Sequence, residues 1–144
     1  MHLKLLTIVT ILVFCFTSTT LAFAQNDDKI VIFHTEFGHL AIELFSDDAP
    51  NTAESFLKLA ESSFYDDTIF HRIIKDFMIQ GGDPNSKESD QSKWGQGGEK
   101  YGGGILAAEF NSIKHDRGIV SMARSAHPDS AGSQFFIVHE KSTH

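Results

Sequence analysis

The chain has 144 residues, the length of one ordinary domain. Hydrophobic residues make up 41% and charged residues 22%, as is typical of a globular protein rather than a disordered one. The formal net charge is −7, whereas a surface that binds phosphate backbones is basic, so no nucleic-acid partner is expected. Thirteen phenylalanines predict a dense aromatic core or an apolar binding floor.

The first 24 residues are predicted to be a signal peptide. A basic start and an apolar run precede Ala-Phe-Ala at residues 22–24, a small-x-small pattern that signal peptidase cleaves. We expect cleavage after Ala24 and an exported protein, periplasmic or secreted. The alternative is an uncleaved membrane anchor, because the uncharged stretch 5–24 is long enough to span a bilayer. The single cysteine, Cys15, lies in this leader, so the exported chain would have no disulfide.

A polar spacer, residues 25–28, follows the leader and precedes one predicted domain over residues 29–144. Apolar runs at residues 29–34 and 40–45 are separated by a turn that contains Gly38. This arrangement predicts a β-hairpin at the start of the domain.

One amphipathic helix is predicted directly after the hairpin. Pro50 suits the first turn of a helix, and either Asp48 or Asn51 is expected to cap its N-terminus. The apolar residues that recur at helical spacing are Ala53, Phe56, Leu57 and Ala60.

The rest of the chain has a β pattern with one long interruption. Strand-like segments occupy residues 70–74, 77–80, 118–123 and 134–138. Residues 84–104 are polar and glycine-rich without periodicity, which is typical of a functional surface loop. Many short strands with one early helix predict a mostly β fold, namely a closed antiparallel β-barrel capped by helices.

The familiar cofactor and metal motifs are not found in this sequence. The glycine-rich stretch 95–100 lacks the third glycine of a dinucleotide fingerprint and the Gly-Lys-Ser/Thr of a phosphate loop. His139, Glu140 and His144 resemble a zinc-protease motif, but the second histidine comes one residue late. Ser133 is not in a nucleophile elbow. We therefore predict no metal and no cofactor.

Two segments resemble the signature sequences of the cyclophilins, the cyclosporin-sensitive peptidyl-prolyl cis-trans isomerases. They are FHRIIKDFMIQGGD at residues 70–83 and GIVSMARSAHPDSAGSQFFIV at residues 118–138. The segment GGEKYGGGILAAEF is similar to the loop between them, and the likeness runs from about Lys29 to the last residue. The resemblance implies an antiparallel β-barrel with two helices, a groove on its outside, and an isomerase that acts on proline-containing polypeptides without a cofactor.

Position by position, the resemblance implies a catalytic role for Arg72. It implies that the proline ring rests on Phe77, Met78 and Phe136. The other substrate-binding positions that it implies are Gln80, Ala123, Arg124, Gln134 and His144. Arg124 stands where asparagine is commoner and resembles bacterial members, and His144 stands where many members have tryptophan. Weak contact with cyclosporin is therefore expected.

The predicted chemistry explains an arginine among apolar side chains. An X–Pro amide rotates slowly because resonance stiffens it, and a guanidinium that donates to the prolyl nitrogen weakens this resonance. Taken alone, Arg72 also fits an edge-strand arginine whose stem covers apolar surface. The main alternative function is accordingly a module that binds proline-containing peptides with weak or no catalysis, and a purely structural role ranks third.

The end of the sequence carries one further expectation. Residues 141–144, KSTH, do not resemble a natural terminus of the family, whose members continue through further strands and a closing helix. The last strands and the C-terminal helix are therefore expected to be missing, which would leave the barrel open along one edge.

Overall fold

The computed structural model describes residues 29–140 of the chain. These residues form six strands, one α-helix and two short 3-10 helices. The strands are β1 Ile30–Thr35, β2 Gly38–Glu43, β3 Arg72–Ile74, β4 Met78–Gly81, β5 Val120–Met122 and β6 Phe135–Val138. The helices are α1 Pro50–Glu61, η1 Pro84–Lys87 and η2 Gln91–Lys93. The predicted hairpin, helix and four later strands are thus confirmed.

Two predictions fall outside this range. The signal peptide with its spacer, residues 1–28, and the groove residue His144 are not among the described residues. Within the described range, no helix has the length and apolar character that crossing a membrane requires.

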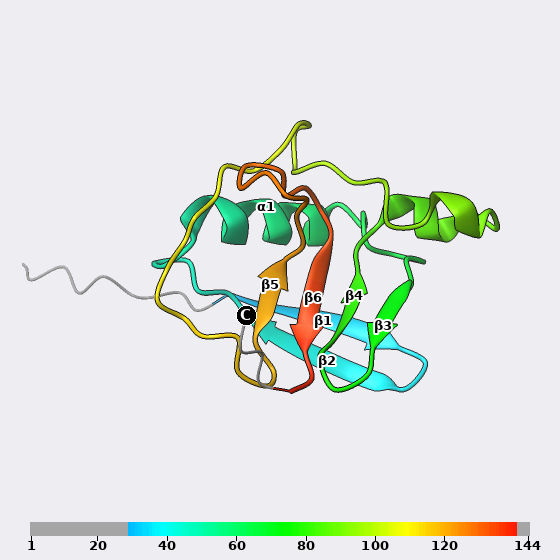
Figure 1. Ribbon diagram of the computed structural model, residues 1–144, viewed down its shortest axis with the longest axis horizontal. Coiled ribbons are helices and arrows are strands. Elements are labelled where there is room, and N and C mark those ends of the chain that lie inside the picture. The colour runs from blue at the N-terminus through cyan, green and yellow to red at the C-terminus, as the bar shows by residue number, and fades with distance from the viewer. Residues whose placement is uncertain (1–28, 141–144) are drawn as a thin grey trace, which may run out of the picture.

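The strands form two sheets that no hydrogen-bonded ladder joins among residues 29–140. β1 pairs with β2, and the other four form an antiparallel sheet in the order β3-β4-β6-β5 (Figure 1). The mostly β prediction is confirmed, but the described residues do not form the predicted closed barrel. A barrel needs pairing around its whole circumference, and here β2 and β5 are each paired on one side only.

Two features stabilise the hairpin: the hydrogen-bonded turn between its strands and the burial of alternate side chains along them. Thr35 Oγ1 donates to the Gly38 carbonyl at 2.8 Å and accepts from the Phe37 amide at 3.2 Å. Gly38 has φ of 125°, a conformation open mainly to glycine. Val31 pairs with Ile42 on the buried face, and the side chains that follow each of them along the strands point to the other face.

The N-terminus of α1 departs from the prediction. The cap residue is Ala49, with no side-chain hydrogen bond, so neither Asp48 nor Asn51 caps the helix. Glu109 does so instead: its carboxylate accepts from the amides of Asn51 at 3.0 Å and Thr52 at 2.8 Å. An acidic group from a distant segment therefore occupies the positive end of the helix dipole.

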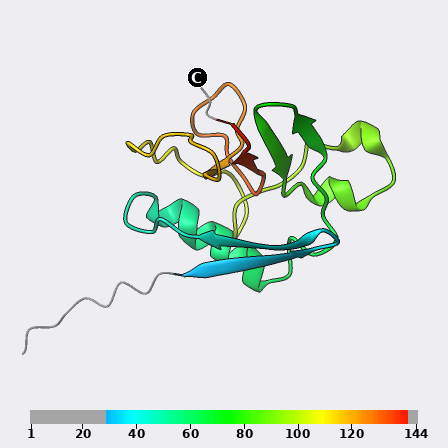
Figure 2. The same cartoon turned by 90° about the horizontal axis from the view of Figure 1, so that it is seen from below.

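The core lies between two layers. The hairpin and α1 are on one side and the four-stranded sheet is on the other (Figure 2). At its centre, the rings of Phe33, Phe56, Tyr65 and Phe135 lie 5.3–6.0 Å apart in all six pairings. The dense aromatic core that the composition predicted is thus present.

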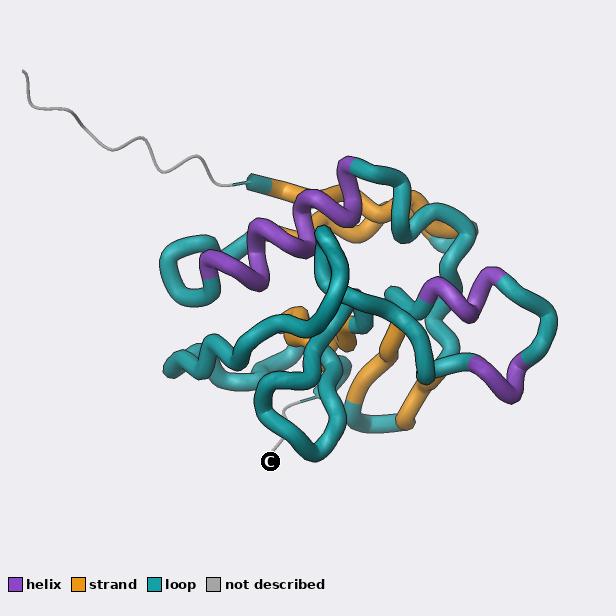
Figure 3. Tube along the Cα trace, turned by 90° about the horizontal axis from the view of Figure 1, so that it is seen from above, coloured by secondary structure: helices purple, strands orange, loops and turns teal. Residues whose placement is uncertain are grey.

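The polar excursion after β4 contains local order that the sequence pattern did not predict. η1 and η2 lie together in a lobe at one side of the molecule (Figure 3). Each begins at an aspartate whose side chain accepts from the amide two residues on, Asp83 from Asn85 and Asp90 from Ser92. Such Asx caps stabilise short turns without any apolar periodicity.

Candidate active site

The strand register gathers the predicted site residues into one row. Arg72 of β3 is opposite Gln80 of β4, Gln80 is opposite Phe136 of β6, and Phe136 is opposite Ser121 of β5. Directly opposed residues share a face of the sheet. Because neighbouring Phe135 points into the aromatic core, the row Arg72–Gln80–Phe136–Ser121 lies on the face turned away from that core.

The Arg72 side chain is exposed, and a hydrogen bond to Gln80 fixes its guanidinium. Its Nη1 donates to Gln80 Oε1 at 3.1 Å. This contact depends on the tight β3–β4 turn, in which Asp76 adopts a positive φ of 59° and the Phe77 amide donates to the Ile74 carbonyl at 3.2 Å. The guanidinium has five N–H donors, so donors remain for a ligand in the groove.

The side chain of Gln80 is held by a second glutamine, Gln134. Its Nε2 donates to Gln134 Oε1 at 2.9 Å, and Gln134 Nε2 donates to the Gly97 carbonyl at 2.7 Å. Gln134 therefore connects the row to the glycine-rich loop. The oxygen and the nitrogen of its side-chain amide are both engaged within the protein, and Gln134 does not line the cleft described below.

The predicted proline floor is an apolar surface beside Arg72. The rings of Phe77 and Phe136 lie 6.4 Å apart, and Met78 beneath them is only 2% exposed. His115 adds a third ring, 5.5 Å from that of Phe136. The structure thus brings the predicted floor residues together next to the charge.

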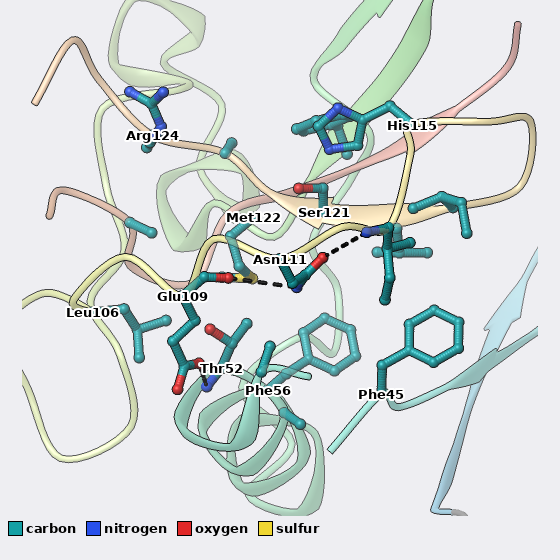
Figure 4. Close-up of a pocket in the computed structure, with 18 of the residues that line it drawn as sticks. Phe45, Thr52, Phe56, Leu106, Glu109, Asn111, His115, Ser121, Met122 and Arg124 are labelled. Carbon is teal, nitrogen blue, oxygen red and sulfur yellow. Dashed lines mark hydrogen bonds between the residues drawn. The ribbon is translucent and has the colours of Figure 1, made fainter. Parts of the chain in front are cut away.

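These residues border an open cleft of about 890 Å³. The predicted site residues that line it are Arg72, Phe77, Met78, Gln80, Ala123, Arg124 and Phe136. Figure 4 shows Thr52, Phe56 and Glu109 on the side of α1, and His115, Ser121 and Arg124 across from them. The cleft therefore continues past β5 toward the hairpin layer.

Two of the predicted substrate-binding residues, Ala123 and Arg124, have partners within the protein. The Ala123 amide donates to the Gln134 carbonyl at 2.9 Å and extends the β5–β6 pairing, so that N–H serves the sheet. Arg124 Nη1 donates to the Ser125 carbonyl at 3.0 Å, and its guanidinium lies 6.0 Å from the centre of the Phe110 ring. The Arg124 guanidinium therefore lies within cation–π distance of the exposed Phe110 at the rim of the cleft.

Sequence reasoning missed His115 and Ser121 as neighbours of the site. Ser121 could have been found, since strand pairing with β6 places it opposite Phe136. No local signal identifies His115, because its approach to Phe136 depends on the irregular segment before β5.

One cluster in the described range has the composition of a metal site, but its surroundings argue against one. The ligand atoms of Asp76, His139 and Glu140 lie within 4.8 Å of one another, and all three residues are exposed. Arg117 Nη1 lies 2.9 Å from His139 Nδ1 and also donates to the His139 carbonyl. Histidine ligands of metals normally donate their second nitrogen to an acceptor, whereas here it meets a cationic donor.

Comparisons with known proteins agree with this geometry. The family model described as "Cyclophilin type peptidyl-prolyl cis-trans isomerase/CLD" matches residues 30–144. Peptidyl-prolyl cis-trans isomerase 10 of Caenorhabditis elegans is 49% identical over 116 residues, covering 79% of this chain and 67% of that relative. Peptidyl-prolyl cis-trans isomerase CYP18-1 of Arabidopsis thaliana is 47% identical over 116 residues, covering 79% of this chain and 68% of that relative.

A solved structure shows the same likeness in three dimensions. The crystal structure of a Cryptosporidium parvum cyclophilin type peptidyl-prolyl cis-trans isomerase, obtained in the presence of the dipeptide Ala-Pro, superposes with a TM-score of 0.71. It is 40% identical, and the match covers 79% of this chain and 70% of that one. This chain thus spans about two thirds of the length of its relatives. Sequence, fold and site geometry agree that the chain belongs to the cyclophilin-type peptidyl-prolyl cis-trans isomerases.

Proposed function

We propose that this chain accelerates rotation about X–Pro bonds in exported polypeptides and thereby assists their folding, with Arg72 as its catalytic residue. The observation that carries the proposal is the position of Arg72 in one row with Gln80 and Phe136. That arrangement sets a guanidinium beside an apolar floor, which is the combination that the reaction requires.

The reaction needs no nucleophile, because no covalent bond is made or broken. Uncatalysed X–Pro rotation takes tens of seconds over a barrier near 20 kcal/mol. Acceleration by about five decades lowers this barrier by roughly 7 kcal/mol. A hydrogen bond from Arg72 to the prolyl nitrogen, which becomes pyramidal as the amide twists, contributes about 1.5–3 kcal/mol.

The remainder comes from binding and orientation. In this proposal Phe77, Met78 and Phe136 seat the proline ring, and their apolar surfaces exclude water from the guanidinium. Gln80 fixes the direction of Arg72 through the 3.1 Å contact. Holding the flanking peptide while one bond rotates supplies the orientational part of the acceleration.

Export is the second part of the proposal. It is supported by the basic start, the apolar run and the Ala-Phe-Ala sequence of the first 24 residues. The substrates are then proline-containing chains that fold in the periplasm or outside the cell. An uncleaved leader would instead anchor the same domain to the membrane.

The decisive experiment is Arg72→Ala in the full chain, with turnover on an Ala-Pro peptide measured by NMR exchange. Loss of one charge-assisted bond should lower kcat about thirtyfold to a hundredfold while the thermal melt changes little, because Arg72 is exposed. Arg72→Lys should restore little, since a point charge on a flexible stem does not reproduce the planar donor. Lys75→Ala is the matched control, because Lys75 is a cation on the turn directly after β3 and its side chain is 91% exposed.

Phe136→Ala separates binding from chemistry. Removal of its ring should raise KM more than it lowers kcat, because the ring seats the substrate in both ground and transition states. If Arg72→Ala kept the turnover of the unmodified chain, Arg72 would be only a surface residue. The alternative, a proline-peptide binding module, would then be the better description.

A further inference from the structure

Hydrogen bonds connect Arg72 to Gln80, Gln80 to Gln134, and Gln134 to the Gly97 carbonyl, and we call this series the line. It ends in a loop that several contacts hold in place. Asp83, at the end of β4, is fully buried. Its carboxylate accepts from the amide of Asn85 at 2.9 Å and from the amide of Gly95. Asp83 therefore ties both ends of the η1–η2 lobe to the sheet. The Gly95 amide that it binds is two residues before Gly97 in the sequence.

The turn formed by residues 95–98 also has no room to shift inward. A β-carbon placed on Gly97 would lie 2.5 Å from Asp83 Oδ1, and one on Gly98 would lie 2.1 Å from Ser133 Oγ. Ser133 is itself fully buried and donates to the Gly82 carbonyl at 2.6 Å. The Gly97 carbonyl is thus a fixed acceptor, although it belongs to a loop.

The two ends of the line determine the orientation of both glutamine amides. The Gly97 carbonyl can only accept, so the Gln134 side chain must present its Nε2 there and its Oε1 to Gln80. Gln80 must then present Nε2 to Gln134, which leaves Oε1 for the guanidinium of Arg72, a group that can only donate. Flipping either amide would set like groups against each other at both of its contacts.

We infer that Gln134 is a positioning residue, through which the fixed 95–98 turn directs the guanidinium of Arg72 by way of Gln80. This inference rests on the proposed function, because alignment of Arg72 by these hydrogen bonds matters for catalysis only if Arg72 acts on the substrate. It changes the role expected for Gln134 from contact with the substrate to alignment of the catalytic group. Catalysis by an exposed, flexible arginine benefits from such alignment because a disordered guanidinium seldom points at the reacting nitrogen.

The test compares Gln134→Glu and Gln134→Ala in the full chain, with kcat and KM measured on an Ala-Pro peptide. A glutamate keeps an acceptor for Gln80 but cannot donate to the Gly97 carbonyl. Both variants should therefore lower kcat about threefold to tenfold with KM nearly unchanged. Gln91→Ala, an exposed glutamine of the same lobe, is the matched control and should behave as the unmodified chain.

Two kinetic results for the Gln134 variants would overturn the inference. One is a kcat for Gln134→Glu equal to that of the unmodified chain. The other is a rise in KM without a fall in kcat, which would return Gln134 to substrate binding. Gln134→Ala should also cause no further loss when added to Arg72→Ala, because residues that act through one group are not additive. If Arg72→Ala alone has no effect, the proposed function fails; if it is impaired while the Gln134 variants are not, only the alignment fails.

A measurement on the unmodified chain does not depend on how the variants fold. The side-chain amide hydrogens of Gln80 and Gln134 should exchange with solvent more slowly than those of the exposed Gln91, because both are engaged in the line. Exchange of all three at one rate would show that the line does not persist in solution. The inference would then be wrong, whatever the kinetics of the variants.

Discussion

Replacing Glu109 by alanine or glutamine tests how the irregular segment before β5 is held against α1. The Glu109 carboxylate accepts from the backbone amides of Asn51 and Thr52 and, at 2.6 Å, from Asn51 Nδ2. It is the acceptor at a helix start where the cap residue, Ala49, makes no side-chain hydrogen bond. Glu109 also comes from a segment that lines the cleft (Figure 4).

The size of the effect follows from these contacts. Loss of a side-chain cap typically costs about 1 kcal/mol, and the attraction of a carboxylate to the helix dipole adds about 0.3–1 kcal/mol. Glu109→Ala should therefore lower the free energy of unfolding by about 1–2 kcal/mol. For a domain of this size that corresponds to a fall in Tm of about 4–8 °C.

The effect should depend on pH in a defined direction. Burial of Glu109 by itself raises the pKa of its carboxyl, but the hydrogen bonds from Thr52 and Asn51 outweigh burial, so the pKa lies below its usual value. A depressed pKa in the folded state means that the contribution to stability is fully present above the pKa of the unfolded chain. It is lost as the pH falls through the lower, folded pKa.

The assay is thermal unfolding followed by circular dichroism at pH 7, 5 and 3 for the unmodified chain and Glu109→Gln. The Tm difference should be largest at pH 7 and should shrink towards pH 3, as the native carboxylate gains a proton. Glu36→Gln, at an exposed position of the hairpin turn, should show no comparable pattern. A Tm difference for Glu109→Gln that is the same at pH 7 and pH 3 would refute the reasoning, because the charge would then not matter.

Three other expectations can be checked directly. N-terminal sequencing of the secreted product should begin at Gln25, whereas an intact Met1 form in the membrane fraction would favour the anchor. Isomerase activity should survive exhaustive chelation, and a loss that zinc restores would show that the active chain holds a metal ion. Tyr65→Phe should lower the free energy of unfolding in urea by about 1–3 kcal/mol, because the Tyr65 hydroxyl donates to the Ser133 carbonyl at 3.1 Å inside the core; an unchanged urea midpoint would contradict this.

Local patterns predicted the strands and α1, but not the two 3-10 helices. Two apolar runs separated by a turn predicted the hairpin, and helical spacing with Pro50 predicted α1. The helix cap could not be predicted locally, because Glu109 lies far along the chain and reaches α1 only through tertiary structure. Closure of the barrel failed for a related reason: the number and type of strands do not state which edges pair, and β2 and β5 stay apart in the described residues.

The candidate site shows the same division. Arg72, Phe77, Met78 and Phe136 were predicted from the resemblance, and the structure places them around one cleft. The resemblance alone did not show that the oxygen and the nitrogen of the Gln134 side-chain amide are both engaged, since that depends on a carbonyl in a glycine-rich loop. Such a loop has no periodicity, so its backbone geometry leaves no pattern in the sequence.

Register is the step that connects this sequence to its proposed function. A strand that slips by one residue turns every side chain to the opposite face. In β3 such a slip would turn Arg72 away from the groove and put Ile73, which is 70% exposed on the opposite face, in its place. The β3–β4 turn, with Asp76 at φ of 59°, fixes the pairing of Arg72 with Gln80. This turn therefore decides whether the guanidinium faces the groove, and one of its residues, Phe77, also lines that groove.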